Sequence, residues 1–219
     1  MSGGSECPEN ARLATGSRSA ALRQGLRTRD SAYFENLYTA NPDPWNFTES
    51  SYEQDKYAAT LGMLGGRSFS RGLEVGCSIG VLTKLLASRC SELLAVDIVE
   101  QALSQARERC ALQANVTFER MHVPEHWPAG CFDLMVFSEI LYFLDNTDIA
   151  RTASLANASL TKDGILLLVN YTETIDEPCT GNEAAELFLQ FFAPENVSIT
   201  HLRNSSFRID VLERRSHSD

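Results

Sequence analysis

The stretch Leu73-Glu74-Val75-Gly76-Cys77-Ser78-Ile79-Gly80 decides the fold that we predict for this chain. Residues 71–77 form a short, mostly apolar run bounded by glycine, which is typical of a buried strand. Apolar residues at helical spacing follow over 81–89, and a second apolar run ends at Asp97. A strand, a glycine turn, a helix and a second strand that ends in an acid form the first βαβ unit of a nucleotide-binding sheet.

The glycine turn has two readings. Read from Gly76, it is G-x-S-x-G, with Ser78 where a dinucleotide fingerprint has its middle glycine and no glycine three residues further on. The same pattern is the nucleophile elbow of α/β-hydrolases, with Ser78 as the nucleophile. That function needs a histidine late in the chain on a loop after a strand, whereas His201 falls in a predicted strand and His217 in the tail.

The acid before the turn favours the other reading. With Glu74 two residues before Gly76, the stretch resembles motif I of S-adenosylmethionine (SAM)-dependent methyltransferases, and Asp97 matches their ribose-binding acid. A carboxylate at this position can accept hydrogen bonds from both ribose hydroxyls. These enzymes bind no pyrophosphate, so they do not need the phosphate-binding glycine pattern.

Composition narrows the possible partners and the compartment. Nineteen basic and 29 acidic residues give a formal net charge of −10, mixed along the chain, which disfavours nucleic acid and suits a cationic or neutral substrate. No apolar run is long enough for stable membrane insertion, and the polar start shows no signal peptide. We expect a reduced, cytoplasmic protein, because the six cysteines form no C-x-x-C pair: Cys7, Cys77, Cys90, Cys110, Cys131 and Cys179.

The chain divides into three parts. Residues 1–18 are predicted to be a disordered tail, 19–65 an N-terminal helical arm and 66–219 the main domain. Two helices are predicted in the arm, over 19–40 and 52–65, separated by a proline-containing turn at 41–45. The arm is either a permanent cap on the sheet or a lid over the ligand.

The remaining pattern predicts a doubly wound, seven-stranded α/β sheet. Strands are expected at 115–123, 132–137 and 165–169, helices at 101–113, about 146–160 and 183–192, and a turn at 162–164. The runs 197–202 and 207–213 indicate a C-terminal antiparallel hairpin, hence one reversed strand. Ligands of such sheets bind at the carboxyl ends of the central strands. Pro124 separates His122 from His126, so we predict no metal site there.

Over residues 52–215 this order resembles the Rossmann-like fold of the class I SAM-dependent methyltransferases. More closely, the chain resembles the nodulation protein S family, N-methyltransferases of lipochitooligosaccharide (Nod factor) synthesis. The resemblance implies SAM as cofactor and, as substrate, the free amine of the non-reducing glucosamine of a deacetylated chitooligosaccharide. It is carried by Asp43-Pro44-Trp45, Tyr52-Glu53-x-x-Lys56-Tyr57, the motif at 73–80, Asp97, Phe132-Asp133-Leu134 and Ser138-Glu139-Ile140-Leu141-Tyr142.

Candidate cofactor-binding residues come from four segments. We expect the glycine turn and Ser138 beside the methionine half, Asp97 on the ribose, and Ile98 and the 121–123 segment near the adenine. Lys56 or a tyrosine of the arm could bind the cofactor carboxylate, although a solvated Lys56 is an equal alternative. The full set is Glu74, Gly76, Cys77, Ser78, Gly80, Asp97, Ile98, Met121, His122, Val123, Ser138, Trp45, Tyr52 and Lys56.

On the acceptor side, Glu139 is the candidate catalytic residue, with Tyr142 as a second candidate. Methyl transfer needs a neutral amine, and a carboxylate after the fourth strand can orient that amine and take its proton. Alternatively, Glu139 caps the following helix or binds the methionine amine of the cofactor. Asp145 and Tyr171 are candidate substrate-binding residues, and Asp145 or Thr147 could also cap the helix that follows.

Two other functions remain open at this point. A methyltransferase for another small molecule would keep the same motifs. A non-catalytic SAM-binding scaffold would keep the glycine turn and Asp97 but lose the polar groups on the acceptor side, whereas Glu139, Tyr142 and Asp145 are present. The sequence leaves the oligomeric state undecided.

Overall fold

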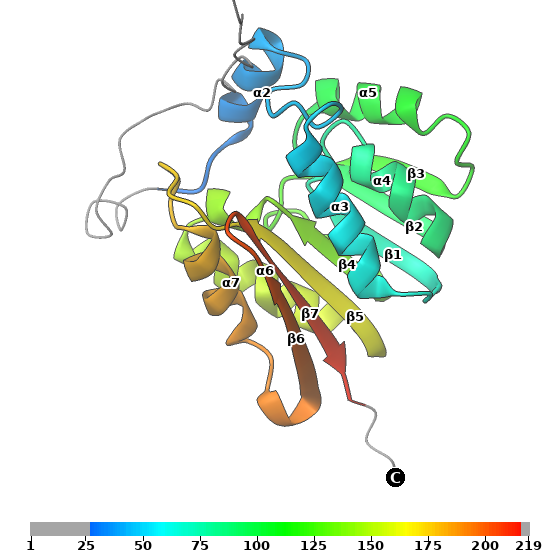
Figure 1. Ribbon diagram of the computed structural model, residues 1–219, viewed down its shortest axis with the longest axis vertical. Coiled ribbons are helices and arrows are strands. Elements are labelled where there is room, and N and C mark those ends of the chain that lie inside the picture. The colour runs from blue at the N-terminus through cyan, green and yellow to red at the C-terminus, as the bar shows by residue number, and fades with distance from the viewer. Residues whose placement is uncertain (1–26, 216–219) are drawn as a thin grey trace, which may run out of the picture.

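The computed structural model describes residues 27–215, which form one seven-stranded sheet with helices on both faces (Figure 1). The strand order is β3-β2-β1-β4-β5-β7-β6. Strand β7 runs antiparallel to both of its neighbours, β5 and β6, which confirms the predicted reversed strand and hairpin. The strands are β1 (Phe69–Val75), β2 (Cys90–Asp97), β3 (Val116–Arg120), β4 (Phe132–Ser138), β5 (Leu160–Tyr171), β6 (Val197–Arg203) and β7 (Phe207–Arg214).

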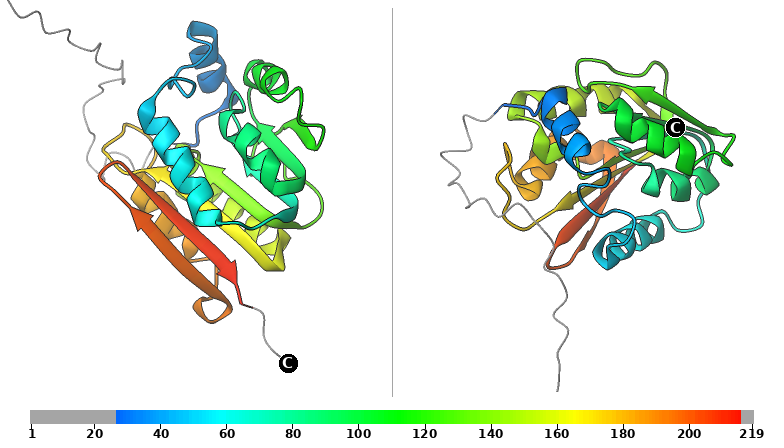
Figure 2. Two further views of the ribbon diagram at one scale, coloured as in Figure 1. Left: turned by 45° about the vertical axis from the view of Figure 1, so that its right-hand side comes forward. Right: turned by 90° about the horizontal axis from the view of Figure 1, so that it is seen from above.

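The helices form one layer on each face of the sheet. In Figures 1 and 2, α3, α4 and α5 cover one face and α6 and α7 the other, while α2 lies above the carboxyl ends of the strands. The helices are α2 (Ser31–Ala40), α3 (Ser51–Leu64), α4 (Val81–Leu86), α5 (Glu100–Arg109), α6 (Asn146–Ser159) and α7 (Gly181–Leu189). Short 3₁₀ turns follow as η1 (Ala87–Arg89), η2 (Leu141–Phe143) and η3 (Pro194–Asn196).

The central strand β4 explains why the fold could be read from apolar runs. Met135 and Phe137 pack in the core cluster on the side of α6 and α7, whereas Leu134 and Val136 pack in the cluster on the side of α3 and α4. A parallel strand that is buried on both faces needs apolar side chains at consecutive positions. This architecture confirms the class I methyltransferase fold.

The predicted turn at 162–164 was wrong. These residues belong to β5, which begins at Leu160, and the register between β4 and β5 shifts between Phe132 and Leu134. Lys162 and Asp163 are exposed there, so the strand needs no apolar side chains at this end. A polar strand end with a glycine therefore has the same sequence pattern as a turn.

Several boundaries also move. The helix predicted over 19–40 is seen as α2, and the tail predicted at 1–18 lies outside the described residues.

Of the described cysteines, all free, Cys131 is exposed, while Cys77, Cys90, Cys110 and Cys179 are buried as small apolar residues. In the part of the chain that the structure describes, no helix has the length and apolar character to cross a membrane.

Candidate functional site

The turn after β1 requires glycine at two positions. Gly76 and Gly80 have φ angles of +80° and +79°, a region that side chains rarely adopt. A Cβ atom on Gly76 would lie 2.0 Å from Cγ2 of Ile140, and one on Gly80 would lie 2.9 Å from the Cα atom of Ala106. The turn is therefore packed tightly between the β4 loop and α5, and its backbone can lie close to a ligand.

Asp97 holds this turn in place from the end of β2. Its Oδ2 accepts a hydrogen bond from the Ser78 amide at 2.8 Å, and its Oδ1 accepts one from the Val99 amide at 2.9 Å. Burial raises the pKa of Asp97, although these amides oppose the shift. A carboxylate has about four acceptor positions, more than these backbone amides occupy, so Asp97 can also accept from a ribose hydroxyl.

Glu74 is a buried carboxylate with an unmatched oxygen. Its side chain, near the end of β1, is buried, and Oε2 accepts no hydrogen bond from the described residues. Burial raises its pKa to about 8. A small cavity of about 30 Å³ adjoins it and is also lined by Gly76, Cys77 and Ser78. An orphaned acceptor beside a glycine turn fits the ammonium end of an amino-acid ligand such as the methionine half of SAM.

A cleft of about 860 Å³ lies at the carboxyl ends of the strands, where the fold rule places a ligand. Glu74 and Cys77 line the smaller cavity instead, and Gly80 packs against α5. Fourteen of the sequence-predicted residues line the cleft: Trp45, Tyr52, Lys56, Gly76, Ser78, Asp97, Ile98, Met121, His122, Val123, Ser138, Glu139, Tyr142 and Tyr171.

Lys56 is buried, so the solvated alternative was wrong. Its side chain is 1% exposed, and its ammonium lies 2.9 Å from Oε1 of Glu53 and 2.8 Å from Oε1 of Glu139. Burial alone would lower its pKa, but the charges of Glu139 and Glu53 outweigh burial and raise it. A lysine ammonium has three N–H donors, so one remains for another acceptor.

Glu139 joins three separate segments of the chain. Besides Lys56 from α3, it binds the Tyr142 hydroxyl at 2.8 Å and the Tyr171 amide at 2.9 Å, both through Oε2. Its backbone has a φ of +60°, which turns the side chain out of β4 toward these donors. Burial and then the charge of Glu139 raise the pKa of Tyr142, which keeps this hydroxyl a hydrogen-bond donor.

Asp145 has a structural role rather than the expected substrate contact. It is the N-cap of α6, where its carboxylate accepts hydrogen bonds from the amides of Thr147 and Asp148. It is also absent from the residues that line the cleft. Because Asp145 supplies this cap, the alternative that Glu139 caps the following helix was wrong.

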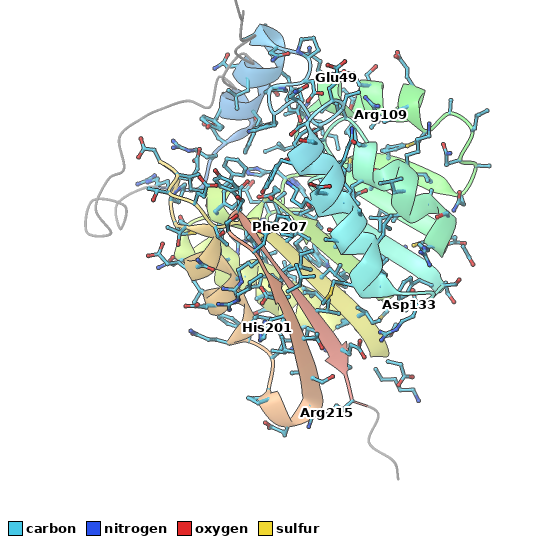
Figure 3. All side chains as sticks on the ribbon, viewed as in Figure 1. Glu49, Arg109, Asp133, His201, Phe207 and Arg215 are labelled. Carbon is cyan, nitrogen blue, oxygen red and sulfur yellow. The ribbon has the colours of Figure 1, made fainter. Side chains whose placement is uncertain are left out.

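Aromatic side chains of the arm form two clusters at the cleft, one around Trp45 and one around Tyr52. Trp45 packs against Tyr38 and Phe143, with ring centroids 5.8 Å and 6.5 Å apart. Tyr52 packs edge-on against Tyr171 and Phe207 at 6.1 Å and 6.0 Å. Figure 3 labels Phe207 at the cleft end of the sheet. The arm therefore contacts the glycine-turn side and the β5–β7 side of the cleft separately.

The described residues hold no group of three or more metal-ligating side chains. His122 lines the cleft, and its Nδ1 lies 3.0 Å from Oε2 of Glu125.

With this geometry established, sequence comparison places the chain in a family. The family model of Nodulation protein S (NodS) matches residues 34–206. The chain belongs to the nodulation protein S family. Nodulation protein S of Rhizobium tropici is 32% identical over 130 residues, which are 59% of this chain and 55% of that protein. The Bradyrhizobium diazoefficiens protein is 36% identical over 104 residues, or 47% and 49% of the two chains. The chain thus spans about half the length of the curated relatives it matches.

Solved structures agree on the fold of this nodulation protein S family member. The N-methyltransferase NodS from Bradyrhizobium japonicum WM9, in complex with S-adenosyl-L-homocysteine, superposes with a TM-score of 0.72 at 20% identity, covering 86% of this chain and 100% of that one. A putative methyltransferase from Pseudomonas syringae has a TM-score of 0.66 at 31% identity, covering 75% and 100%.

Sequence reasoning missed several side chains of this family member's cleft. Glu53 was noted only as part of a motif, and its spacing of three residues from Lys56 was the signal that both lie on one helix face. Tyr38 was not among the predicted site residues, yet its hydroxyl contacts that of Ser78. Arg29 and Glu177 pair at 2.7 Å across the rim, a contact between segments that no local pattern predicts.

Proposed function

We propose that this protein is a SAM-dependent N-methyltransferase that methylates the free amine of the non-reducing glucosamine of a deacetylated chitooligosaccharide, in Nod factor synthesis. The observation that carries the proposal is one continuous cleft that joins the glycine turn and Asp97 to the acidic cluster around Glu139. Membership of the nodulation protein S family and the fold shared with an N-methyltransferase crystallised with S-adenosylhomocysteine support SAM-dependent N-methyl transfer.

The cofactor would be held by groups that are already in place. Asp97 would bind the ribose, Ile98 and the 121–123 segment would border the adenine, and Glu74 would face the methionine ammonium. Bound SAM supplies an electrophilic methyl group on a sulfonium. The chain itself contributes alignment, because an in-line displacement depends mostly on the position of the nucleophile.

The acceptor side suits an amino sugar. Glu53 and Glu139 give this wall of the cleft negative charge, which attracts an amine, while the rings of Tyr52 and Tyr171 offer flat apolar surfaces. The cleft volume of about 860 Å³ lies near the upper end of the roughly 300–1,000 Å³ known for ligand pockets. The cleft therefore has room for a second ligand beside the cofactor.

We also propose that the arm, residues 19–65, is a lid. Its described part reaches the cofactor side of the cleft through the Tyr38 hydroxyl, which contacts Ser78, and through its backbone oxygens at Tyr38 and Pro42, which accept from Gln101 and Gln105 at 3.0 Å. Closure of such a segment excludes water from the reacting groups.

The expected surroundings follow from composition. A cytoplasmic location agrees with five free cysteines among the described residues, since thiols stay reduced there. A net charge of −10 makes nucleic acid a poor partner.

Transfer of a radiolabelled methyl group tests the function. The purified protein with SAM should label a deacetylated chitooligosaccharide and leave the fully N-acetylated oligomer unlabelled, because an amide nitrogen is a poor nucleophile. Equal labelling of the two oligomers would refute the amino-sugar substrate, and binding of S-adenosylhomocysteine without any transfer would favour a scaffold.

A further inference from the structure

The cluster of Glu53, Lys56 and Glu139 carries more negative than positive charge. Two carboxylates share one ammonium, at 2.9 Å and 2.8 Å, and Lys56 is 1% exposed. Buried charges are normally paired, since an uncompensated charge out of water is costly. The formal charge of −1 that remains in this cluster therefore calls for a further cation or proton from the cleft, which both carboxylates line.

The two carboxylates differ in their remaining capacity. Glu139 accepts three hydrogen bonds, from Lys56, Tyr142 and the Tyr171 amide. Glu53 accepts one from Lys56 through Oε1, and its buried Oε2 has no hydrogen-bond partner in the described structure. Because the oxygen without a partner is on Glu53, a hydrogen bond from a new donor would stabilise the cluster more at Glu53 than at Glu139.

The surroundings of Glu53 also favour proton uptake. Burial raises its pKa, and the nearby Lys56 only partly opposes that shift. The Tyr57 hydroxyl lies beside the Glu53 carboxylate, and burial, then the charge of Glu53 and its contact with that carboxylate, raise the pKa of Tyr57, although Oε2 of Glu53 has no hydrogen-bond partner among the described residues. A carboxylate with a raised pKa and a vacant lone pair is a better base than one held by three donors.

We infer that Glu53 accepts the proton of the acceptor amine, while Lys56 and Glu139 are positioning residues that fix its carboxylate. The inference rests on the proposed function. A protonated amine gives one proton to Glu53 Oε2 and becomes neutral. Its lone pair then forms the N–C bond as the C–S bond breaks, with that electron pair left on sulfur. The product leaves as a secondary ammonium ion, and Glu53 releases its proton to water.

The pH profile of Glu53→Gln tests this assignment. With Glu53, the productive complex forms from a carboxylate and an ammonium ion, so kcat/KM should be flat between the pKa of Glu53 and that of the amine, about 7.7–8.0 for an α-amino group. Without it, only the neutral amine reacts, so kcat/KM should rise tenfold per pH unit up to that pKa. At pH 7, kcat should fall about 100-fold or more, the usual contribution of a general base.

Gln is expected to preserve the fold, because Lys56 and Glu139 then form a one-to-one pair. Calorimetry should show unchanged affinity for S-adenosylhomocysteine. With that ligand bound, Glu53→Gln should lose affinity for the deacetylated oligomer but not for the N-acetylated one. Asp55→Asn, an exposed carboxylate of the same helix, is the matched control and should behave as wild type.

Glu139→Gln separates positioning from proton transfer. It should lower kcat while keeping the flat pH profile, because Glu53 is still present. A Glu53→Gln profile identical to that of the wild type, or weakened binding of S-adenosylhomocysteine instead of the oligomer, would overturn the inference. A wild-type protein that transfers no methyl group to the deacetylated oligomer would instead refute the proposed function itself.

Discussion

In the cofactor half of the cleft, Asp97 binds backbone amides, whereas in the acceptor half Lys56 binds side chains. Asp97 contacts the amides of Ser78 and Val99, close in sequence and dictated by one βαβ unit. Lys56 and Glu139 come from α3 and the end of β4, and they meet only in the folded chain. The cofactor half is thus a local structure, and the acceptor half depends on how the arm docks.

The largest effect should come from removing the shared cation. Lys56→Met leaves the buried carboxylate of Glu53 and the partly buried carboxylate of Glu139 without their shared ammonium, and breaking a buried ion pair typically costs about 3–5 kcal/mol. Urea unfolding at pH 7.5 should show this loss of stability. Burial raises the pKa of Glu53, and the Lys56 ammonium that opposes this shift would be gone, so the loss should shrink as the pH falls through the raised pKa of Glu53.

The control for this change is Lys84→Met on α4, because Lys84 is exposed. Exposed substitutions usually change stability by less than about 0.5 kcal/mol. If Lys56→Met lowered the free energy of unfolding as little as Lys84→Met does, the acceptor half would not depend on the ion pair, and the contrast between the two halves would disappear.

The second effect concerns the cofactor half. Asp97→Ala should weaken binding of S-adenosylhomocysteine at least tenfold, because hydrogen bonds to a charged group contribute about 1.5–3 kcal/mol each. Isothermal calorimetry measures this directly, and the protein should still fold.

Asp133→Ala is a matched control for Asp97→Ala. Asp133 also accepts hydrogen bonds from two backbone amides, those of Ser70 and Arg71 at 2.7 Å and 2.8 Å. It lies at the opposite end of the sheet from the cleft (Figure 3). It should lose a similar amount of stability but keep full affinity. Equal affinities for the two variants would remove Asp97 from the site.

The smallest effect should be seen in the dynamics of the arm. S-adenosylhomocysteine should slow hydrogen exchange in residues 40–57 far more than in residues 207–213 of β7, because a lid gains contacts only when the ligand is bound. Mass spectrometry of the exchanged peptides provides the measurement. The same protection with and without ligand would identify the arm as a permanent cap.

The sequence predicted the fold and the position of Asp97 beside the glycine turn because their signals are local. An apolar run, two required glycines and Asp97 lie within one βαβ unit, and each has a physical reason to be where it is. The fourth strand likewise followed from the uninterrupted apolar run 134–137.

The acceptor half was predicted only in part. Glu139 and Tyr142 were identified because they follow a central strand, but the burial of Lys56 and the unpartnered oxygen of Glu53 depend on how α3 packs. Asp145 was predicted both as a helix cap and as a substrate ligand, because a capping aspartate and a binding aspartate have the same sequence context, and only the capping role is seen. The spacing of polar residues along a sequence does not indicate which residues they contact in the folded chain.

Lys56 and Glu139 are in contact but far apart in the sequence, and this has a consequence for the order of folding. Their contact closes a loop of 83 residues, whereas the contact of Asp97 with Ser78 closes one of 19. Loop-closure entropy makes the longer closure about 1.3 kcal/mol more costly. We therefore expect the glycine turn and Asp97 to assemble early, while the charge cluster forms only after β4 is in place. A chain whose synthesis stops before β4 would contain the glycine turn and Asp97 but lack Glu139, and with it the charge cluster.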